Sequence, residues 1–135
     1  MLDERSRLEL VRRHYAAYNA HDIEAQLATL APEIEIVAFD EAGRVSEHWR
    51  GTEQARDFFI GIRALVANSH ANVEMLRADG DRIFARLTLS GILRRTGDAG
   101  AIQAVHRHGF SDRSIAKIQT YRPDWRPRAE QLRRP

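Results

Sequence analysis

One stretch near the start of the chain reads Tyr15-Ala16-Ala17-Tyr18-Asn19-Ala20-His21-Asp22 and separates two helical patterns. Before and within it, apolar residues recur with the period of a helix over residues 5–19, at Leu8, Val11, Tyr15 and Tyr18. The polar segment 19–22 breaks that pattern, and Asp22 is a suitable N-cap for a short second helix through Leu27 and Leu30. The stretch therefore predicts two consecutive helices with a tight connection.

The next part of the chain predicts a pair of strands and a third helix. Residues 33–39 have the composition of a strand and end in a turn signal, after which residues 44–49 can return as a short strand. Gly51 and Thr52 then open a helix, with Thr52 as its cap and with residues 68–70 as its end. The apolar stripe of this helix consists of Ala55, Phe58, Phe59, Ile62, Leu65 and Val66.

The second half of the chain is rich in strands. We predict four of them, over residues 71–78, 82–94, 101–110 and 114–121. Helices that precede a mostly antiparallel sheet are typical of the α+β class. We expect a cone-shaped, curved sheet packed against three helices, with a small-molecule pocket at its open end. One domain over residues 1–122 and a basic tail over residues 123–135 account for the whole chain.

Composition limits the classes of function. The 135 residues are 43% hydrophobic and include no cysteine, which excludes disulfides, thiolate metal sites and cysteine nucleophiles. The N-terminus lacks the apolar segment of a signal peptide, and no apolar run approaches the roughly 20 residues that span a membrane. We therefore expect a cytoplasmic protein without a membrane partner. The net charge of +2 comes from the tail, and no nucleic-acid-binding motif accompanies it, so nucleic acid is not an expected partner.

Four stretches resemble the SnoaL-like branch of the nuclear transport factor two-like superfamily, which includes ketosteroid isomerases, polyketide cyclases and limonene epoxide hydrolases. They are residues Tyr15–Asp22, Leu30–Ile36, Trp49–Phe59 and Ile115–Tyr121. The resemblance implies a cone-shaped α+β domain, and it implies a homodimer formed through the outer face of the sheet. The superfamily places many functions on one fold, so the reaction has to be inferred from the pocket.

The strongest candidates for catalysis are His106 and His108. Alternate residues of a strand share a face, so both histidines point the same way as Ile102, Ala104 and Phe110. That face is largely apolar and is predicted to be the concave one. Imidazoles titrate near neutral pH and can take or give protons. The resemblance implies that the oxyanion-hole donor of the isomerases falls on or beside His106.

The first helix and the first strand supply further candidates. The resemblance places the oxyanion-hole tyrosine of the isomerases at His14, with Tyr15 or Tyr18 as other sources of a pocket hydroxyl. It places their general base at Ala38, so Asp40 is the best available carboxylate. Asp40 is either a catalytic base at the pocket mouth or a turn residue, which is the commoner role of Asp before Glu-Ala-Gly.

Aromatic residues are the expected contacts for a flat substrate. Those predicted to bind it are Tyr15, Tyr18, Trp49, Phe58 and Phe110. Trp49 stands just before the third helix, where it can stack on a ligand or pack in the core.

Three functions are compatible with these residues. The first is a cofactor-free enzyme that isomerises or cyclises a cyclic or polyketide-like carbonyl compound by proton transfer, using His106, His108 and His14. The second is a non-catalytic ligand-binding module or dimeric scaffold, which the missing carboxylate on the first strand favours. The third is a metal-dependent enzyme in which the two strand histidines bind the metal, with a third ligand from Asp40, His14 or His48.

Overall fold

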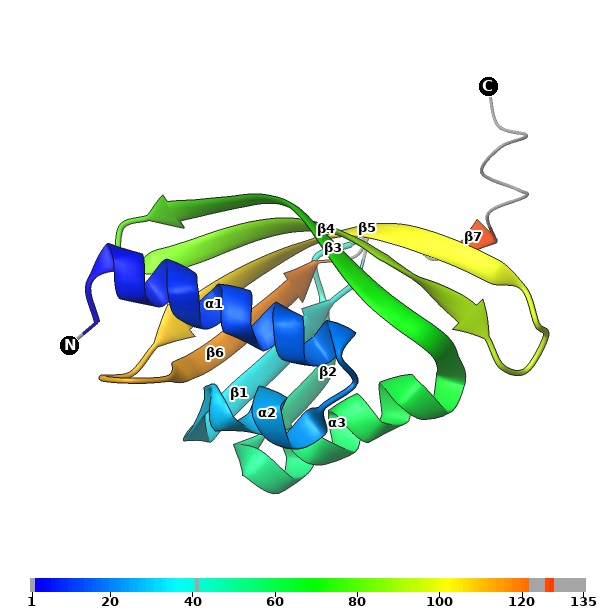
Figure 1. The fold of residues 1–135 in the computed structure, drawn as a ribbon, viewed down its shortest axis with the longest axis horizontal. Coiled ribbons are helices and arrows are strands. Elements are labelled where there is room, and N and C mark those ends of the chain that lie inside the picture. The colour runs from blue at the N-terminus through cyan, green and yellow to red at the C-terminus, as the bar shows by residue number, and fades with distance from the viewer. Residues whose placement is uncertain (1, 41, 122–125, 128–135) are drawn as a thin grey trace.

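The computed structural model describes residues 2–40, 42–121 and 126–127 and shows a curved sheet with helices on one side (Figure 1). The elements are α1 Glu4–Asn19, α2 Ile23–Ala28, β1 Leu30–Phe39, β2 Val45–Arg50, α3 Gly51–Leu65, β3 Val66–Asp79, β4 Arg82–Leu93, β5 Ala99–Phe110, β6 Ile115–Tyr121 and β7 Arg126–Pro127. The strands lie in the order β2-β1-β6-β5-β4-β3. The β1–β6 pair is parallel and the other pairs are antiparallel. The predicted α+β architecture is confirmed.

The core fills the space between the concave face of the sheet and the helices. Helix α1 contacts β3 and β4, and α3 contacts β1, β2 and β3 (Figure 1). Along β4, Ile83 and Leu87 are completely buried, whereas Arg86 is exposed, as the two-residue period of a strand requires. Burial of each large aliphatic side chain contributes about 1.5–3 kcal/mol, so this face anchors the fold.

The connection after α1 is fixed to β3 by side-chain hydrogen bonds. The Asn19 side chain accepts from the Ala71 backbone N–H at 2.7 Å and donates to the Ala71 carbonyl at 2.9 Å. His21 Nε2 donates to the Ser69 carbonyl at 2.9 Å, and His21 itself has a positive φ of 57°. Asp22 caps α2, because its carboxylate accepts from the Ala25 N–H at 3.0 Å. The stretch therefore sets where the last turns of α1 lie over the sheet.

The predicted end of the third helix is wrong by a few residues. Helix α3 ends at Leu65, and residues 68–70, predicted to end it, lie inside β3. Asn68 has a positive φ of 54°, which asparagine tolerates better than most residues. The register between β3 and β4 shifts at the same place. A polar segment that suggests a helix end is here an irregularity within a strand.

The predicted caps of the second and third helices also need correction. Thr52 does not cap α3, which begins after Arg50 and has no side-chain cap. Instead the Arg50 backbone N–H donates to the Gln54 side-chain oxygen at 2.7 Å. Helix α2 ends before Leu30, which is the first residue of β1.

Part of the predicted tail contributes to the sheet. Residues 126–127 form β7, which pairs with the start of β5. The other residues of the predicted tail, 123–125 and 128–135, lie outside the described residues. No helix in the described part of the chain is both long and apolar enough to cross a membrane.

Candidate functional site

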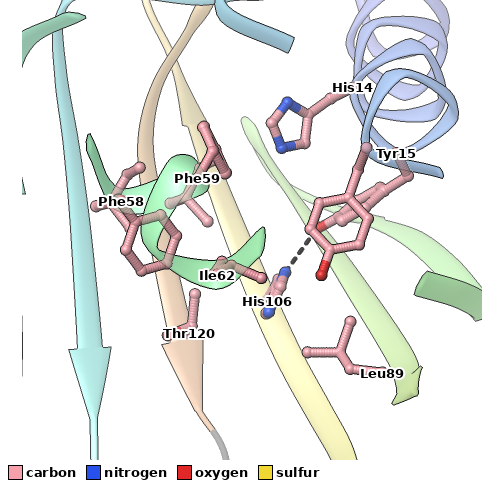
Figure 2. A pocket seen from close by; sticks show the side chains of 11 residues that line it. His14, Tyr15, Phe58, Phe59, Ile62, Leu89, His106 and Thr120 are labelled. Carbon is pink, nitrogen blue, oxygen red and sulfur yellow. Dashed lines mark hydrogen bonds between the residues drawn. The ribbon is translucent and has the colours of Figure 1, made fainter. Parts of the chain in front are cut away.

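A cavity of about 60 Å³ opens between α1, α3 and the concave face of the sheet (Figure 2). The described residues that line it are His14, Tyr15, Tyr18, Ile36, Phe58, Phe59, Ile62, Leu89, His106, Ile118 and Thr120. Tyr18, Phe58, Ile62, Leu89 and His106 are only half-buried, so they mark the side that opens to solvent. About 10–15 Å³ is enough for one water molecule, so this space admits a few waters or part of one small ring.

A chain of hydrogen bonds links α1 to two histidines of β5. The Tyr15 hydroxyl lies 2.7 Å from His106 Nδ1 and 2.7 Å from His108 Nε2. The other nitrogen of His108, Nδ1, lies 3.0 Å from the Ile83 carbonyl oxygen, which can only accept. His108 Nδ1 therefore carries the hydrogen and donates it to Ile83.

The direction of the remaining bonds follows from the charge of His108. This residue is completely buried, and desolvation lowers its pKa from 6.5 to about 4, so the ring is neutral near pH 7. Neutral His108 with a hydrogen on Nδ1 has only a lone pair on Nε2, so the Tyr15 hydroxyl donates to it. Burial raises the pKa of Tyr15 well above its usual value, which keeps that hydroxyl protonated.

These hydrogen bonds also determine which nitrogen of His106 carries the hydrogen. The single hydroxyl hydrogen of Tyr15 is directed to His108, so the Tyr15 oxygen accepts from His106 Nδ1–H. When His106 is neutral, its basic lone pair is then on Nε2. His106 lines the cavity, and Figure 2 shows its ring beside Tyr15, Leu89 and Thr120. Tyr15 and His108 together thus hold the cavity-lining imidazole in one tautomer.

His14 lines the same cavity from α1 and is held in a similar way. It is 3% exposed, and its Nδ1 lies 3.1 Å from the Thr29 hydroxyl. Desolvation is the largest cause that lowers the His14 pKa from 6.5 to about 3, with His108 as a second cause. His14 is therefore neutral at any pH near neutrality.

The sequence matches the SnoaL-like domain family over residues 11–118, which is most of the chain. The chain belongs to the SnoaL-like domain family. None of the curated proteins matches it.

Solved structures place the SnoaL-like domain in the same group of folds. A protein from Catenulispora acidiphila with a ketosteroid isomerase-like fold, solved with trimethylamine, is 19% identical with a TM-score of 0.74 over 85% of each chain. A candidate polyketide cyclase from Xanthomonas campestris pv. campestris is 18% identical with a TM-score of 0.76, over 87% of this chain and 90% of that chain. A cystatin-fold protein from Novosphingobium aromaticivorans is 18% identical with a TM-score of 0.71, over 84% of this chain and 96% of that chain. At these identities the likeness establishes the shared fold alone.

Neither Ala38, where the resemblance places the isomerase base, nor Asp40, the best carboxylate found in the sequence, supplies a base to this SnoaL-like domain. Ala38 is buried on β1, and the described residues that line the cavity include no carboxylate, lysine or arginine. Asp40 is exposed and forms the turn after β1, where its carboxylate accepts from the backbone N–H groups of Ala42 and Arg44, both at 2.9 Å. Of the two roles predicted for Asp40, the structure shows the turn residue, and nothing places its carboxylate at the cavity as a catalytic base.

The predicted aromatic contacts divide into two groups. Tyr15, Tyr18 and Phe58 line the cavity, whereas Trp49 and Phe110 do not and pack against the core. The Trp49 ring lies 5.6 Å from that of Phe58, so it supports a cavity residue from behind. Sequence reasoning did not single out Thr120, which lies directly opposite His106 in the β5–β6 register. The inward alternation of Ile118 and Thr120 on the last strand would have indicated it.

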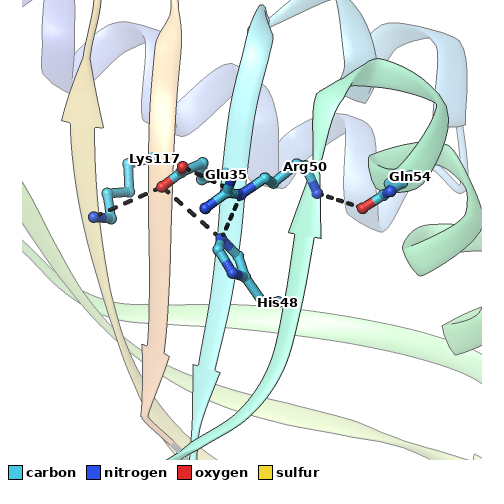
Figure 3. Close-up of polar contacts among 5 residues, drawn as sticks. All are labelled: Glu35, His48, Arg50, Gln54 and Lys117. Carbon is cyan, nitrogen blue, oxygen red and sulfur yellow. Dashed lines mark hydrogen bonds and ion pairs between the residues drawn. The ribbon is translucent and has the colours of Figure 1, made fainter.

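The described part of the SnoaL-like domain offers no set of metal ligands for the metal-dependent alternative. Within residues 2–40, 42–121 and 126–127, no three His, Asp or Glu side chains converge as metal ligands would. Both nitrogens of His108 already have partners. His48 lies on β2 in a surface cluster with Glu35, Arg50 and Lys117 (Figure 3). Because Ile36 lines the cavity, its neighbour Glu35 points to the other face of β1, and so does this cluster.

The two buried histidines predict a loss of stability in weak acid. Both have a lowered pKa in the folded protein, about 3 for His14 and about 4 for His108, so the unfolded chain binds more protons below pH 6.5. Each then lowers the free energy of unfolding by about 1.4 kcal/mol for every pH unit below 6.5. We expect a loss of about 4 kcal/mol between pH 7 and pH 5, measured by urea unfolding. Equal free energies of unfolding at the two pH values would contradict neutral burial of these rings.

Proposed function

We propose that this SnoaL-like domain is a cofactor-free isomerase or cyclase that moves protons on a small cyclic or polyketide-like carbonyl compound. The observation that carries the proposal is the Tyr15 hydroxyl, placed 2.7 Å from both His106 and His108 beside an apolar cavity. An orienting group that fixes the tautomer of a reactive imidazole is a recurrent arrangement in acid–base catalysis.

His106 is the proposed general base. Its Nε2 takes a proton from the carbon next to the substrate carbonyl, and the electrons of that C–H bond form the enolate. The imidazolium keeps its Nδ1–H on the Tyr15 oxygen, so the geometry of the ring does not change during transfer. His106 then returns the proton to a different carbon for isomerisation. For cyclisation, the enolate carbon attacks a second carbonyl, and the proton goes to the new alkoxide.

Hydroxyl groups at the cavity are the proposed stabilisers of the enolate oxygen. Tyr15 does not serve, because its hydrogen is directed to His108. Thr120 lines the cavity opposite His106, and Tyr18 lines it from α1. Each carries a hydroxyl that can donate to an oxygen as negative charge develops there. His14 cannot donate, since its N–H is directed to Thr29.

The size of the cavity favours a small substrate. About 60 Å³ is far below the roughly 300–1,000 Å³ of pockets that enclose drug-sized ligands. In this conformation part of a single ring enters, and the rest of the compound extends through the half-buried mouth. The relative solved with trimethylamine supports a small-molecule site in this fold.

Isomerisation of 3-cyclohexenone to 2-cyclohexenone tests the proposal, because it needs one proton removed and one returned within a single small ring. We expect the purified protein to accelerate it, followed by absorbance of the conjugated product. The substitution His106→Gln should reduce the rate about 10²- to 10⁴-fold, which is the usual contribution of a general base. A rate that is the same with His106→Gln as with the unmodified protein would exclude His106 as the base.

The non-catalytic ligand-binding module is the second candidate. The absence of a carboxylate among the described lining residues favours it. Saturable binding of 2-cyclohexenone, combined with no isomerisation of 3-cyclohexenone by the unmodified protein, would support this alternative. The homodimer and the cytoplasmic location stay predictions.

A further inference from the structure

His14 presents a lone pair to the cavity, and two hydrogen bonds fix this state. The Thr29 hydroxyl donates to the Gln26 carbonyl at 2.6 Å, so the Thr29 oxygen can only accept from His14. His14 Nδ1 lies 3.1 Å from that oxygen and therefore carries the ring hydrogen. A neutral imidazole has one N–H, which leaves Nε2 as an acceptor. The lowered pKa of His14, about 3, keeps the ring neutral.

The lone pair of His14 faces the interior of the cavity. The two nitrogens of an imidazole point in different directions, and Nδ1 faces Thr29, which is not among the lining residues. His14 itself lines the cavity, and Figure 2 shows its ring extending from α1 toward Phe59 and the space above His106. Among the described residues, Nε2 has no hydrogen-bond partner. A ligand that donates a hydrogen bond to this nitrogen inside the apolar cavity therefore gains affinity over a ligand of the same shape that cannot donate.

The surroundings of His14 favour an uncharged donor. The rings of Tyr15 and Phe59 lie 5.2 and 5.8 Å from the His14 ring, which makes this part of the cavity apolar on two sides. No described lining residue carries a carboxylate that could pair with a cation. Burial of an unpaired charge is far more costly than burial of a hydroxyl that forms a hydrogen bond.

We propose that His14 selects small, uncharged ring compounds that carry a hydroxyl group, by accepting a hydrogen bond from that hydroxyl at Nε2. This role is the reverse of the oxyanion-hole donor that the resemblance to ketosteroid isomerases places at His14. The inference rests on the proposed function only in taking this cavity as the ligand site. It concerns binding and does not require turnover.

The state of the ring can be measured in the unmodified protein. Nitrogen-15 NMR of the histidine side chains should show His14 with hydrogen on Nδ1 and a bare Nε2. Addition of phenol should shift the Nε2 resonance, and addition of toluene, which has nearly the same shape, should not. A hydrogen on Nε2 in the ligand-free protein overturns the proposal, and this measurement does not depend on any variant folding.

Selectivity is tested by the ratio of phenol affinity to toluene affinity, obtained from NMR titrations. We expect His14→Leu to lower this ratio about tenfold or more, since the variant removes the acceptor and keeps an apolar side chain. His70→Leu is the matched control, because His70 is exposed on β3 and does not line the cavity; it should leave the ratio unchanged. An unchanged ratio in folded His14→Leu protein, or tighter binding of trimethylammonium than of phenol, overturns the inference.

Failure of the two proposals can be told apart. If 3-cyclohexenone is not isomerised but phenol is preferred over toluene through His14, the catalytic proposal fails and the selectivity stands. If isomerisation depends on His106 but the ratio does not depend on His14, the selectivity fails and the catalytic proposal stands.

Discussion

Replacement of Tyr15 by phenylalanine is expected to lower the rate of 3-cyclohexenone isomerisation about 10- to 100-fold, although Tyr15 does not transfer the proton itself. The variant leaves the His106 ring in place but removes the oxygen that accepts from its Nδ1–H at 2.7 Å. His106 then exchanges between tautomers and orientations, and Nε2 is basic for only part of the time. Partners that fix the orientation of a functional histidine commonly contribute about this much.

The pH profile separates this positioning role from a loss of folding. In Tyr15→Phe the imidazolium of His106 loses a hydrogen-bond acceptor that stabilises it, so the neutral base is populated at lower pH and the rate–pH profile should shift to lower pH. The same change also removes the donor to buried His108, which should lower the free energy of unfolding by about 1–3 kcal/mol. Tyr121→Phe is the control, because Tyr121 stacks on Phe39 and does not line the cavity. A full rate and an unshifted profile in Tyr15→Phe would show that the hydroxyl does not position His106.

His108→Ala is expected to reduce stability far more than His106→Ala. His108 is completely buried, and both of its nitrogens are hydrogen-bonded, to Ile83 and to Tyr15. Its removal creates a cavity and leaves the Ile83 carbonyl without this donor, so we expect a loss of about 3–5 kcal/mol. His106 is half-buried at the cavity, so His106→Ala should lower the free energy of unfolding by about 1–2 kcal/mol, because it removes the hydrogen bond to Tyr15 and less packing.

Urea unfolding at pH 7.5 measures both variants under conditions where neither buried imidazole is protonated. The rates of isomerisation, corrected for the folded fraction of each variant, should rank in the opposite order. His106→Ala should lose more rate than His108→Ala. Equal losses of stability in the two variants would contradict the division of the pair into a positioning residue and a proton-transfer residue. If folded His106→Ala kept the full isomerisation rate, that result would also contradict the assignment of proton transfer to His106.

Local patterns in the sequence determined much of the scaffold. The two-residue period of a strand places both His106 and His108 on the concave face, and the structure confirms that both point inward. The break at residues 19–22 and the cap at Asp22 were predictable because capping depends on residues within one turn. The end of α3 could not be predicted in the same way. A polar segment such as 68–70 forms a helix end or an irregularity within a strand, depending on which strand pairs with it.

The different roles of the two histidines were not visible in the sequence. They have the same type, the same strand and the same face, yet one is completely buried and the other lines the cavity. The difference arises because Tyr15, 91 and 93 residues away along the chain, is brought between them by the packing of α1 on the sheet. The sequence alone determined which side chains face inward, since strand and helix periods are local properties of the backbone. Which inward side chains meet, and which nitrogen holds each hydrogen, depended on contacts between distant segments and was decided only by the tertiary structure.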